Sequence, residues 1–93
     1  MIISVADKET GRFYITGKSK RFPASLFKAA VRKLDYLNRA KVLQDLPAPP
    51  GSHLEALKGG DKGKHRIRIN DQYRIVFTFH AGDAADVEIT DYH

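Results

Sequence analysis

The last three residues of the chain, Asp91, Tyr92 and His93, combine three side chains suited to proton transfer. A histidine titrates near neutral pH, a phenol donates or accepts a proton, and an aspartate orients either group. Cleavage of RNA by its own 2′-hydroxyl requires such a base and acid, together with cations around the pentacoordinate phosphate. Most terminal tripeptides are instead frayed polar tails. This pattern alone leaves both interpretations open.

A second group with chemical potential consists of Arg66, Arg68 and Arg74. Strand alternation places Arg66 and Arg68 on one face of a sheet, and pairing within a hairpin brings Arg74 close to them. Guanidinium groups so near one another repel unless an acid such as Glu88, or a bound phosphate, compensates. A salt-bridge lattice and a phosphate site fit this pattern equally well. Arg74 is the candidate to stabilise negative charge on a reacting phosphate.

A third candidate segment follows the prolines, where Leu54 and Leu57 are expected to anchor the chain to the core. His53, Glu55 and Lys58 then lie nearer to solvent. Glu55 is a candidate proton acceptor, Lys58 a candidate phosphate ligand and His53 a candidate RNA contact. Each of the three could equally be a polar side chain that contacts only solvent.

Several kinds of chemistry are excluded or disfavoured by composition. The chain has no cysteine, so it forms no disulfide and has no thiol nucleophile or thiolate zinc ligand. We expect no required metal and no cofactor, because the histidines lack the spacing of a metal site. No segment approaches the roughly 20 apolar residues of a membrane span, and the start lacks a basic stretch before its apolar run. We therefore expect a cytoplasmic protein.

The distribution of charge is more informative than the net charge of +5. Residues 8–41 contain ten Lys or Arg against two acids, whereas residues 83–93 contain four acids and no Lys or Arg. A basic body attracts a polyanion, since phosphate binding releases condensed counterions. A solvated basic surface without a nucleic-acid partner explains the charge equally well.

The elements that must position these groups follow from periodicity. Residues 1–6 alternate weakly and predict a short strand. Asp7 is suited to cap a short helix that runs through Tyr14 and that Gly17 ends. A longer helix is predicted to begin near Pro23. Its apolar stripe consists of Leu26, Phe27, Ala30, Val31, Leu34 and Leu37. The basic residues of this helix, Lys28, Arg32, Lys33 and Arg39, are expected largely outside that stripe.

The second half of the chain changes to a period of two. After one helical turn at residues 43–46 and a proline elbow at 47–51, we predict strands near 66–69, 73–79 and 87–92. Helices followed by an antiparallel meander make an α+β fold. We expect a single domain over residues 1–93, with a short N-terminal strand and helices packed on a three-stranded meander. One face of that meander carries the arginines and stays open to solvent.

Three stretches of the chain together resemble HigB toxins of the RelE/ParE superfamily. They are the leucine-lysine-glycine segment at 54–59, the hairpin at 65–75 and the terminal residues 91–93. Each stretch is a modest signal, but their order, spacing and position at the end of the chain make the combination specific. The resemblance extends over the whole chain and implies the RelE/ParE-like fold.

The resemblance also implies a function and partners. HigB proteins are cytoplasmic toxins that enter the ribosomal A site, cut messenger RNA there without metal, and are neutralised by a helix-turn-helix antitoxin of the HigA type. By position, Arg74 contacts the scissile phosphate, Asp91, Tyr92 and His93 are catalytic, and Lys58 assists. The hairpin arginines and the last three side chains are therefore expected to converge around a single phosphodiester. Glu55 stands where the family often has a histidine, so the identity of the general base stays open. We expect the antitoxin to contact the basic helical surface, the arginine-bearing face, or both.

Two other functions compete with this interpretation. A ParE-like toxin shares the fold but poisons DNA gyrase, and it has no use for proton-transfer groups at the C-terminus. A nonenzymatic module that binds ribosomal RNA needs only the arginines. Substitution of His93 by alanine separates these cases, because only a nuclease loses growth arrest while it still binds ribosomes.

Overall fold

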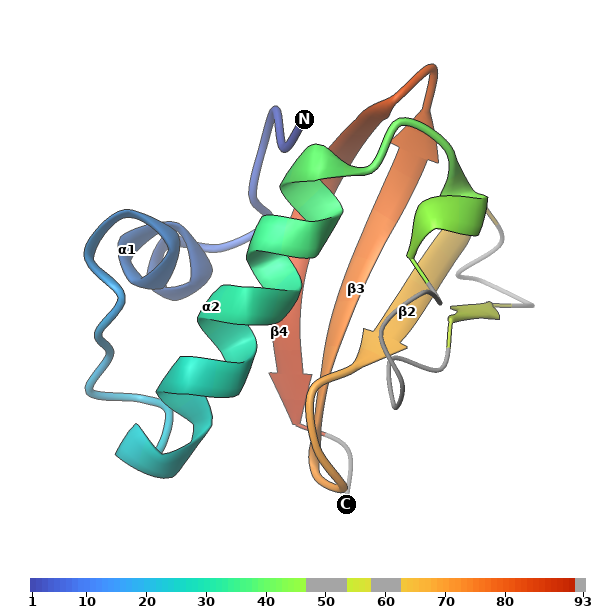
Figure 1. Cartoon of the computed structure of the whole chain (residues 1–93). Coiled ribbons are helices and arrows are strands. Elements are labelled where there is room, and N and C mark those ends of the chain that lie inside the picture. The colour runs from blue at the N-terminus through green and yellow to red at the C-terminus, as the bar shows by residue number, and fades with distance from the viewer. Residues whose placement is uncertain (47–53, 58–62, 92–93) are drawn as a thin grey trace.

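The computed structural model describes residues 1–46, 54–57 and 63–91. Two helices lie on one face of an antiparallel sheet whose strand order is β1-β2-β3-β4 (Figure 1). The elements are α1 (Lys8–Thr16), α2 (Ala24–Arg39), a 3₁₀ turn (Leu43–Asp45), β1 (Glu55–Ala56), β2 (Lys64–Arg68), β3 (Tyr73–His80) and β4 (Asp83–Asp91). The α+β fold predicted from periodicity is confirmed, with a fourth, two-residue strand added at the edge.

Helix α1 has the predicted caps, Asp7 and Gly17, but it continues to Thr16, two residues beyond the predicted Tyr14. The carboxylate of Asp7 accepts a hydrogen bond from the backbone N–H of Thr10 at 3.4 Å, which caps the first turn. Gly17 follows the last turn with a φ of 73°, a left-handed conformation in which glycine avoids a steric penalty. Its N–H donates to the carbonyl oxygen of Phe13 at 2.7 Å.

Helix α2 is also confirmed, but the burial of two of its side chains differs from the prediction. Val31 was expected inside and is 45% exposed, whereas Lys33 was expected outside and is only 5% exposed. The buried residues of α2 are Leu26, Ala30, Lys33, Leu34 and Leu37. These buried positions follow one another at intervals of three and four residues, through Lys33. The buried face of α2 is therefore rotated about the helix axis relative to the predicted stripe.

The apolar face of the sheet is fixed by the register of its three long strands. Ile67 of β2 pairs with Ile75 of β3, and Ile75 pairs with Ile89 of β4. All three are at most 1% exposed and face the helices. The hairpin between β2 and β3 turns at Asn70, whose side-chain oxygen accepts hydrogen bonds from the N–H groups of Gln72 and Tyr73. The predicted hairpin is therefore confirmed.

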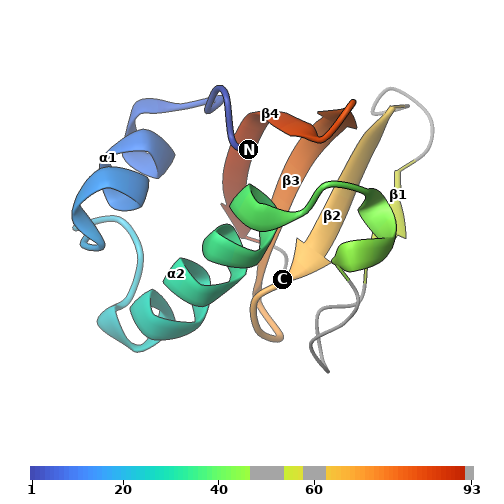
Figure 2. The ribbon, with the colours of Figure 1, turned by 45° about the horizontal axis from the view of Figure 1, so that its top comes forward.

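Both ends of the sheet differ from the sequence-based expectation. The predicted N-terminal strand is reduced to two isolated parallel bridges, in which Ile2 pairs with Ala84 and Val5 with Val87. Figure 2 shows these N-terminal residues beside β4. At the other edge, β1 pairs with β2 through only two residues. A strand this short shows no alternation, so periodicity could not identify it.

Candidate functional site

Three arginines gather on the face of the sheet that points away from the helices. Because Ile67, Ile75 and Ile89 face the helices, their neighbours along each strand face the opposite way. Arg68 and Arg74 are direct cross-strand partners. Arg66 lies two residues from Arg68 on the same face. We call these three residues, Arg66, Arg68 and Arg74, the arginine face.

Each guanidinium of the arginine face is held by a neighbour. Arg66 Nη2 donates to Glu55 Oε2 at 3.0 Å, and Arg68 forms an ion pair with Asp71. Arg74 Nη1 donates to the backbone carbonyl oxygens of Asn70 and Tyr73. Like charges placed directly opposite destabilise a sheet, so these contacts offset the repulsion and fix the side chains.

Two acids other than Glu88 pair with the arginines. Glu88, one of the two compensators considered from sequence, lies on the same face, opposite Val76. The ion pairs are made instead by Glu55, which lies on the unpredicted strand β1, and by Asp71, three residues after Arg68 in the hairpin turn. A carboxylate at that spacing in a turn is a sequence signal that would have identified Asp71.

Glu55 and the end of β4 lie at opposite edges of the arginine face. The order of strands places β1 at one edge, β2 and β3 with the arginines in the middle, and β4 at the other edge. Glu55 is the partner of Arg66 and its side chain is 53% exposed. Arg74 pairs with Thr90, the residue directly before the terminal tripeptide.

Asp91 does not lie on the arginine face, and the expectation that it converges there with Arg74 is wrong. It pairs with Tyr73 and lies two residues after Ile89, so its side chain points to the helix side. With Arg21, Phe22, Tyr73 and Ile89 it lines a hollow of about 160 Å³. Its Oδ2 accepts a hydrogen bond from Gln72 Nε2 at 3.1 Å. Because side chains two residues apart on a strand share a face, the sequence pattern of Val87, Ile89 and Asp91 already predicts that Asp91 lies on the helix side.

Lys33 is a buried cation that sequence reasoning assigned to the surface. It belongs to the row of α2 that faces the sheet. Burial lowers the pKa of Lys33 below its ordinary value of 10.5, and the positive charges of Arg32 and Arg68 lower this pKa further. The charge of Arg68 therefore acts on Lys33, on the helix side of the sheet, although Arg68 itself belongs to the arginine face.

Four of the predicted site residues, His53, Lys58, Tyr92 and His93, lie outside the described residues. Within the ranges that the structure describes, no three acidic or histidine side chains are grouped so that they could hold a metal ion. The helices in those ranges are too short or too polar to cross a membrane.

Comparison with known proteins gives a consistent result. The family model for RelE-like toxins of the type II toxin-antitoxin system HigB matches residues 3–93. The chain is 40% identical over 85 residues to Toxin HigB-1 of Vibrio cholerae serotype O1, covering 90% of each protein. It is 36% identical over 69 residues to an uncharacterized protein of Haemophilus influenzae, covering 73% of this chain and 68% of that protein.

A solved structure supports the fold independently. The crystal structure of a mutant of YafQ from E. coli superposes with a TM-score of 0.58, covering 98% of this chain and 91% of that one. The two sequences are only 13% identical, so this likeness concerns the arrangement of helices and strands.

Proposed function

The chain belongs to the HigB family of RelE-like toxins of type II toxin-antitoxin systems, and we propose that it is an endoribonuclease that cuts messenger RNA on the ribosome. In this proposal the arginine face binds the scissile phosphodiester. Arg74 contacts the phosphate, and Arg66 and Arg68 hold the flanking backbone together with Lys58 and His53.

One observation carries the proposal. Arg68 and Arg74 are direct partners on the open face, and Thr90, the partner of Arg74, directly precedes the terminal tripeptide. Two guanidinium groups at adjacent strand positions form the bidentate hydrogen bonds that a phosphate accepts. The sequence then continues from this position into the residues suited to proton transfer.

The strand order also suits an in-line reaction. The 2′-oxygen bonds to phosphorus as the bond from phosphorus to the 5′-oxygen breaks, so base and acid are needed on opposite sides of the phosphate. Glu55 at the β1 edge accepts the proton of the 2′-hydroxyl. Tyr92 and His93, which follow the β4 edge in sequence, return a proton to the departing 5′-oxygen. The products are a 2′,3′-cyclic phosphate and a 5′-hydroxyl.

Asp91 has a different part in this scheme. Because its carboxylate is on the helix side and accepts a hydrogen bond from Gln72, it ties the end of β4 to the hairpin turn. We assign it the role of orienting the two residues that follow. The turn that it holds also contains Asn70, whose carbonyl oxygen accepts from Arg74.

In this proposal the ribosome positions the substrate, because the toxin itself has few groups that could do so. Positioning a nucleophile and its target in reactive geometry contributes roughly 7–11 kcal/mol to lowering a barrier. We propose that the ribosomal A site, with its ribosomal RNA, holds the message in this geometry, so that free RNA is cut slowly. Membership of a type II system implies an antitoxin, and we propose one of the helix-turn-helix HigA type as its class.

The proposal is tested by cleavage of a defined message in a reconstituted translation reaction, with mapping of the new RNA ends. His93→Ala should reduce cleavage by about 100-fold or more, because general acid catalysis typically contributes 10²–10⁴-fold. Binding of the variant to ribosomes should persist in co-sedimentation. The control is Arg39→Ala, which removes an exposed ion pair with Asp35 on α2 and should cut normally.

Two results would contradict the proposal. Equal cleavage of free and translated RNA would remove the role of the ribosome. Growth arrest that survives His93→Ala, with no new RNA ends, would instead support poisoning of DNA gyrase or binding of ribosomal RNA without cleavage.

A further inference from the structure

Four consecutive residues between the two helices, Lys18, Ser19, Lys20 and Arg21, form a turn that we call the basic loop. With Arg12 of α1, the first three of them line a hollow of about 400 Å³. The side chains of Arg12, Lys18 and Lys20 are exposed around this hollow. The basic loop is separate from the arginine face, because it joins α1 to α2 on the helix side of the sheet (Figure 1).

The three cations that line this hollow have no acid to offset them. Of the two acids nearby, Asp7 is paired with Arg21 at 3.1 Å, and Glu9 Oε2 accepts a hydrogen bond from Ser19 Oγ at 2.6 Å. The three cations form no ion pair with any acid in the part of the chain that the structure describes. Clustered positive charges repel one another and attract a polyanion. A bound anion would therefore relieve a repulsion that the arginine face offsets with its own acids.

The dipole of α1 does not account for these lysines. A cation stabilises a helix when it lies near the last turn, and this effect falls off within that turn. The last turn of α1 contains no basic residue, and Lys18 and Lys20 lie beyond Gly17, which ends the helix. A ligand outside the helix explains their placement better than stabilisation of α1 does.

The hydroxyl groups of the hollow hold the backbone of the basic loop and leave its lysine side chains in solvent. Ser19 Oγ accepts hydrogen bonds from the N–H groups of Arg21 at 3.0 Å and Phe22 at 3.3 Å. Thr16 Oγ1 accepts from the N–H of Lys18 at 3.2 Å. A lysine is a compact charge on a flexible stem. Lysines on a fixed backbone therefore present ammonium groups that can follow a row of phosphates.

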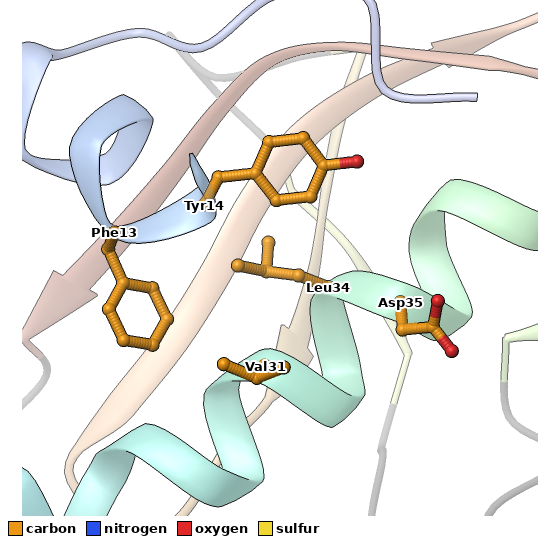
Figure 3. A pocket seen from close by; sticks show the side chains of 5 residues that line it. All are labelled: Phe13, Tyr14, Val31, Leu34 and Asp35. Carbon is orange, nitrogen blue, oxygen red and sulfur yellow. The ribbon is translucent and has the colours of Figure 1, made fainter. Parts of the chain in front are cut away.

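Aromatic residues place the basic loop beside the end of β4. Phe22, directly after the loop, packs edge-on against Tyr73 of β3 at 5.9 Å between ring centroids, and against Phe13 of α1 at 6.2 Å. Figure 3 shows the ring of Phe13 extending from α1 beside α2. Arg21 and Phe22 line a hollow of about 160 Å³ together with Asp91, the last residue of β4. The basic loop therefore begins where the strand that leads to the terminal residues ends.

The path from the arginine face to the basic loop passes around the end of β4. Arg74 and Tyr73 are adjacent in the chain and point to opposite sides of the sheet, and they pair with Thr90 and Asp91. A strand of RNA that lies on Arg74 reaches the loop by crossing this end of the sheet. In the proposed reaction the departing 5′-oxygen is on the side of β4. The nucleotides that cross here are therefore those downstream of the cut, on its 3′ side.

We propose that the basic loop, with Arg12, binds the sugar-phosphate backbone of the message downstream of the cleaved bond. The ligand is single-stranded RNA, held through its phosphates and without preference for a base. The inference rests on the proposed cleavage of messenger RNA, and it gives the direction of the strand across the toxin. The upstream part of the message lies toward β1, and the downstream part bends around β4 onto the helix side.

The first test measures affinity for a single-stranded RNA whose 2′-O-methyl groups prevent cleavage, by fluorescence anisotropy at several salt concentrations. The double substitution Lys18→Ala and Lys20→Ala should raise Kd by about 10-fold. It should also lower the slope of log affinity against log salt by about 1.4, since each phosphate contact to a single strand contributes about 0.7. The matched control is Arg39→Ala with Lys41→Ala, which removes the same charge beyond the other end of α2, about 24 Å along the helix. Equal losses of affinity in the two double variants would overturn the proposal, and circular dichroism verifies folding.

The second test determines the direction of the strand. A message with 2′-O-methyl groups around the A-site codon carries one 4-thiouridine, either upstream or downstream of that codon. The toxin is bound to ribosomes on this message and irradiated, and cross-linked peptides are identified by mass spectrometry. The downstream probe should cross-link to residues 17–22, and the upstream probe should not. Cross-links of the loop to the upstream probe would reverse the strand, and cross-links to ribosomal RNA alone would make that RNA the ligand; either result overturns the proposal.

Failure of this inference is distinguishable from failure of the proposed function. A wild type that leaves translated messages intact contradicts the proposed cleavage. A wild type that cuts them, with an unchanged Kd in the variant of Lys18 and Lys20, contradicts only the assignment of the basic loop.

Discussion

The arginine face and the basic loop lie on opposite sides of the same sheet, and they differ in how their positive charges are held. The first is a charged surface whose guanidinium groups are fixed by Glu55, Asp71 and backbone carbonyls. In the second, the lysine side chains are exposed and only the backbone is fixed, by Ser19 and Thr16. A fixed guanidinium fork suits one phosphate in one place, whereas an ammonium group on a flexible stem tolerates a strand that moves. Under the two proposals, the arginine face binds the phosphate that reacts and the basic loop binds the phosphates that follow it, so that neither surface serves both purposes.

The two regions also depend on different kinds of contact. The arginine face is formed by a hairpin whose register is set by neighbouring residues in sequence. The position of the basic loop depends on aromatic packing between distant segments. Phe13 of α1 packs against Phe22 at 6.2 Å and against Phe27 at 5.4 Å between ring centroids. Substitutions can therefore affect one region with little effect on the other.

The largest expected effect is on the stability of the helices that hold the basic loop. Phe13→Ala removes a ring that is 1% exposed, and should lower the free energy of unfolding by about 3–5 kcal/mol. Urea unfolding measures this loss. Hydrogen exchange should show that α1 loses protection before β2 and β3 do. Tyr14→Ala, at the neighbouring 39% exposed position, is the control and should cost much less. Equal loss of protection in helix and hairpin would show that the regions are not separable.

The next largest effect separates the two surfaces. Arg74→Ala should reduce cleavage about 10²–10³-fold, the usual cost of removing a donor aimed at developing negative charge. Arg74→Lys should rescue little, because an ammonium group cannot reproduce the bidentate fork. Cross-linking of the basic loop to the downstream strand should persist in both variants. An Arg74→Ala variant that cuts normally, but whose basic loop no longer cross-links to the message, would reverse the assignment of the two surfaces.

The same difference in contacts explains how much of the molecule was predictable from sequence. The caps of α1 and the hairpin at Asn70 depend on neighbouring residues, and both were predicted correctly. The burial of Lys33 and the exposure of Val31 depend on the rotation of α2 against the sheet and α1. A periodic stripe shows that a helix has a buried face, but it does not determine the edges of that face.

Among the site residues, the arginines were predicted best because strand alternation determines their face. Alternation also determines the face of Asp91, which lies opposite Tyr73 on the helix side, whereas Arg74 pairs with Thr90 on the other face. Glu55 could not be placed from sequence, because β1 exists only through pairing with β2. The place of the basic loop beside the end of β4 could not be predicted, since it depends on the packing of Phe22 against Tyr73.

A smaller effect is expected from the cap of α1. Asp7→Ala removes the acceptor for Thr10 N–H and the ion pair with Arg21 at 3.1 Å, and should cost about 1 kcal/mol of stability. Because Asp7 is the acid that offsets Arg21 of the basic loop, affinity for RNA should rise in this variant. The matched control is Asp45→Ala, which removes the acceptor for the N–H groups of Lys41 and Val42 at a distance from the basic loop. Equal gains of RNA affinity in the two variants would contradict this local role.

The smallest expected effect concerns Lys33, the group through which the two sides of the sheet interact electrostatically. Its pKa is lowered below 10.5 first by burial and then by the charges of Arg32 and Arg68. The unfolded chain therefore binds more protons than the folded chain between the lowered pKa and 10.5, and stability due to this group rises with pH across that interval. Lys33→Met removes the titrating group, so the free energy of unfolding of this variant should rise less with pH than that of the wild type.

Urea unfolding near pH 7 and near pH 10, for the wild type and Lys33→Met, isolates this contribution from that of the other lysines. Replacing Arg68 by alanine in both backgrounds completes a double-mutant cycle. Arg68→Ala should reduce the pH-dependent difference, because one of the charges that lower the pKa of Lys33 is gone. The contradicting result is a pH-dependent difference in the free energy of unfolding between wild type and Lys33→Met that is the same with and without Arg68. That result would show that the arginine face does not act on Lys33 of α2. The two sides of the sheet would then be electrostatically independent.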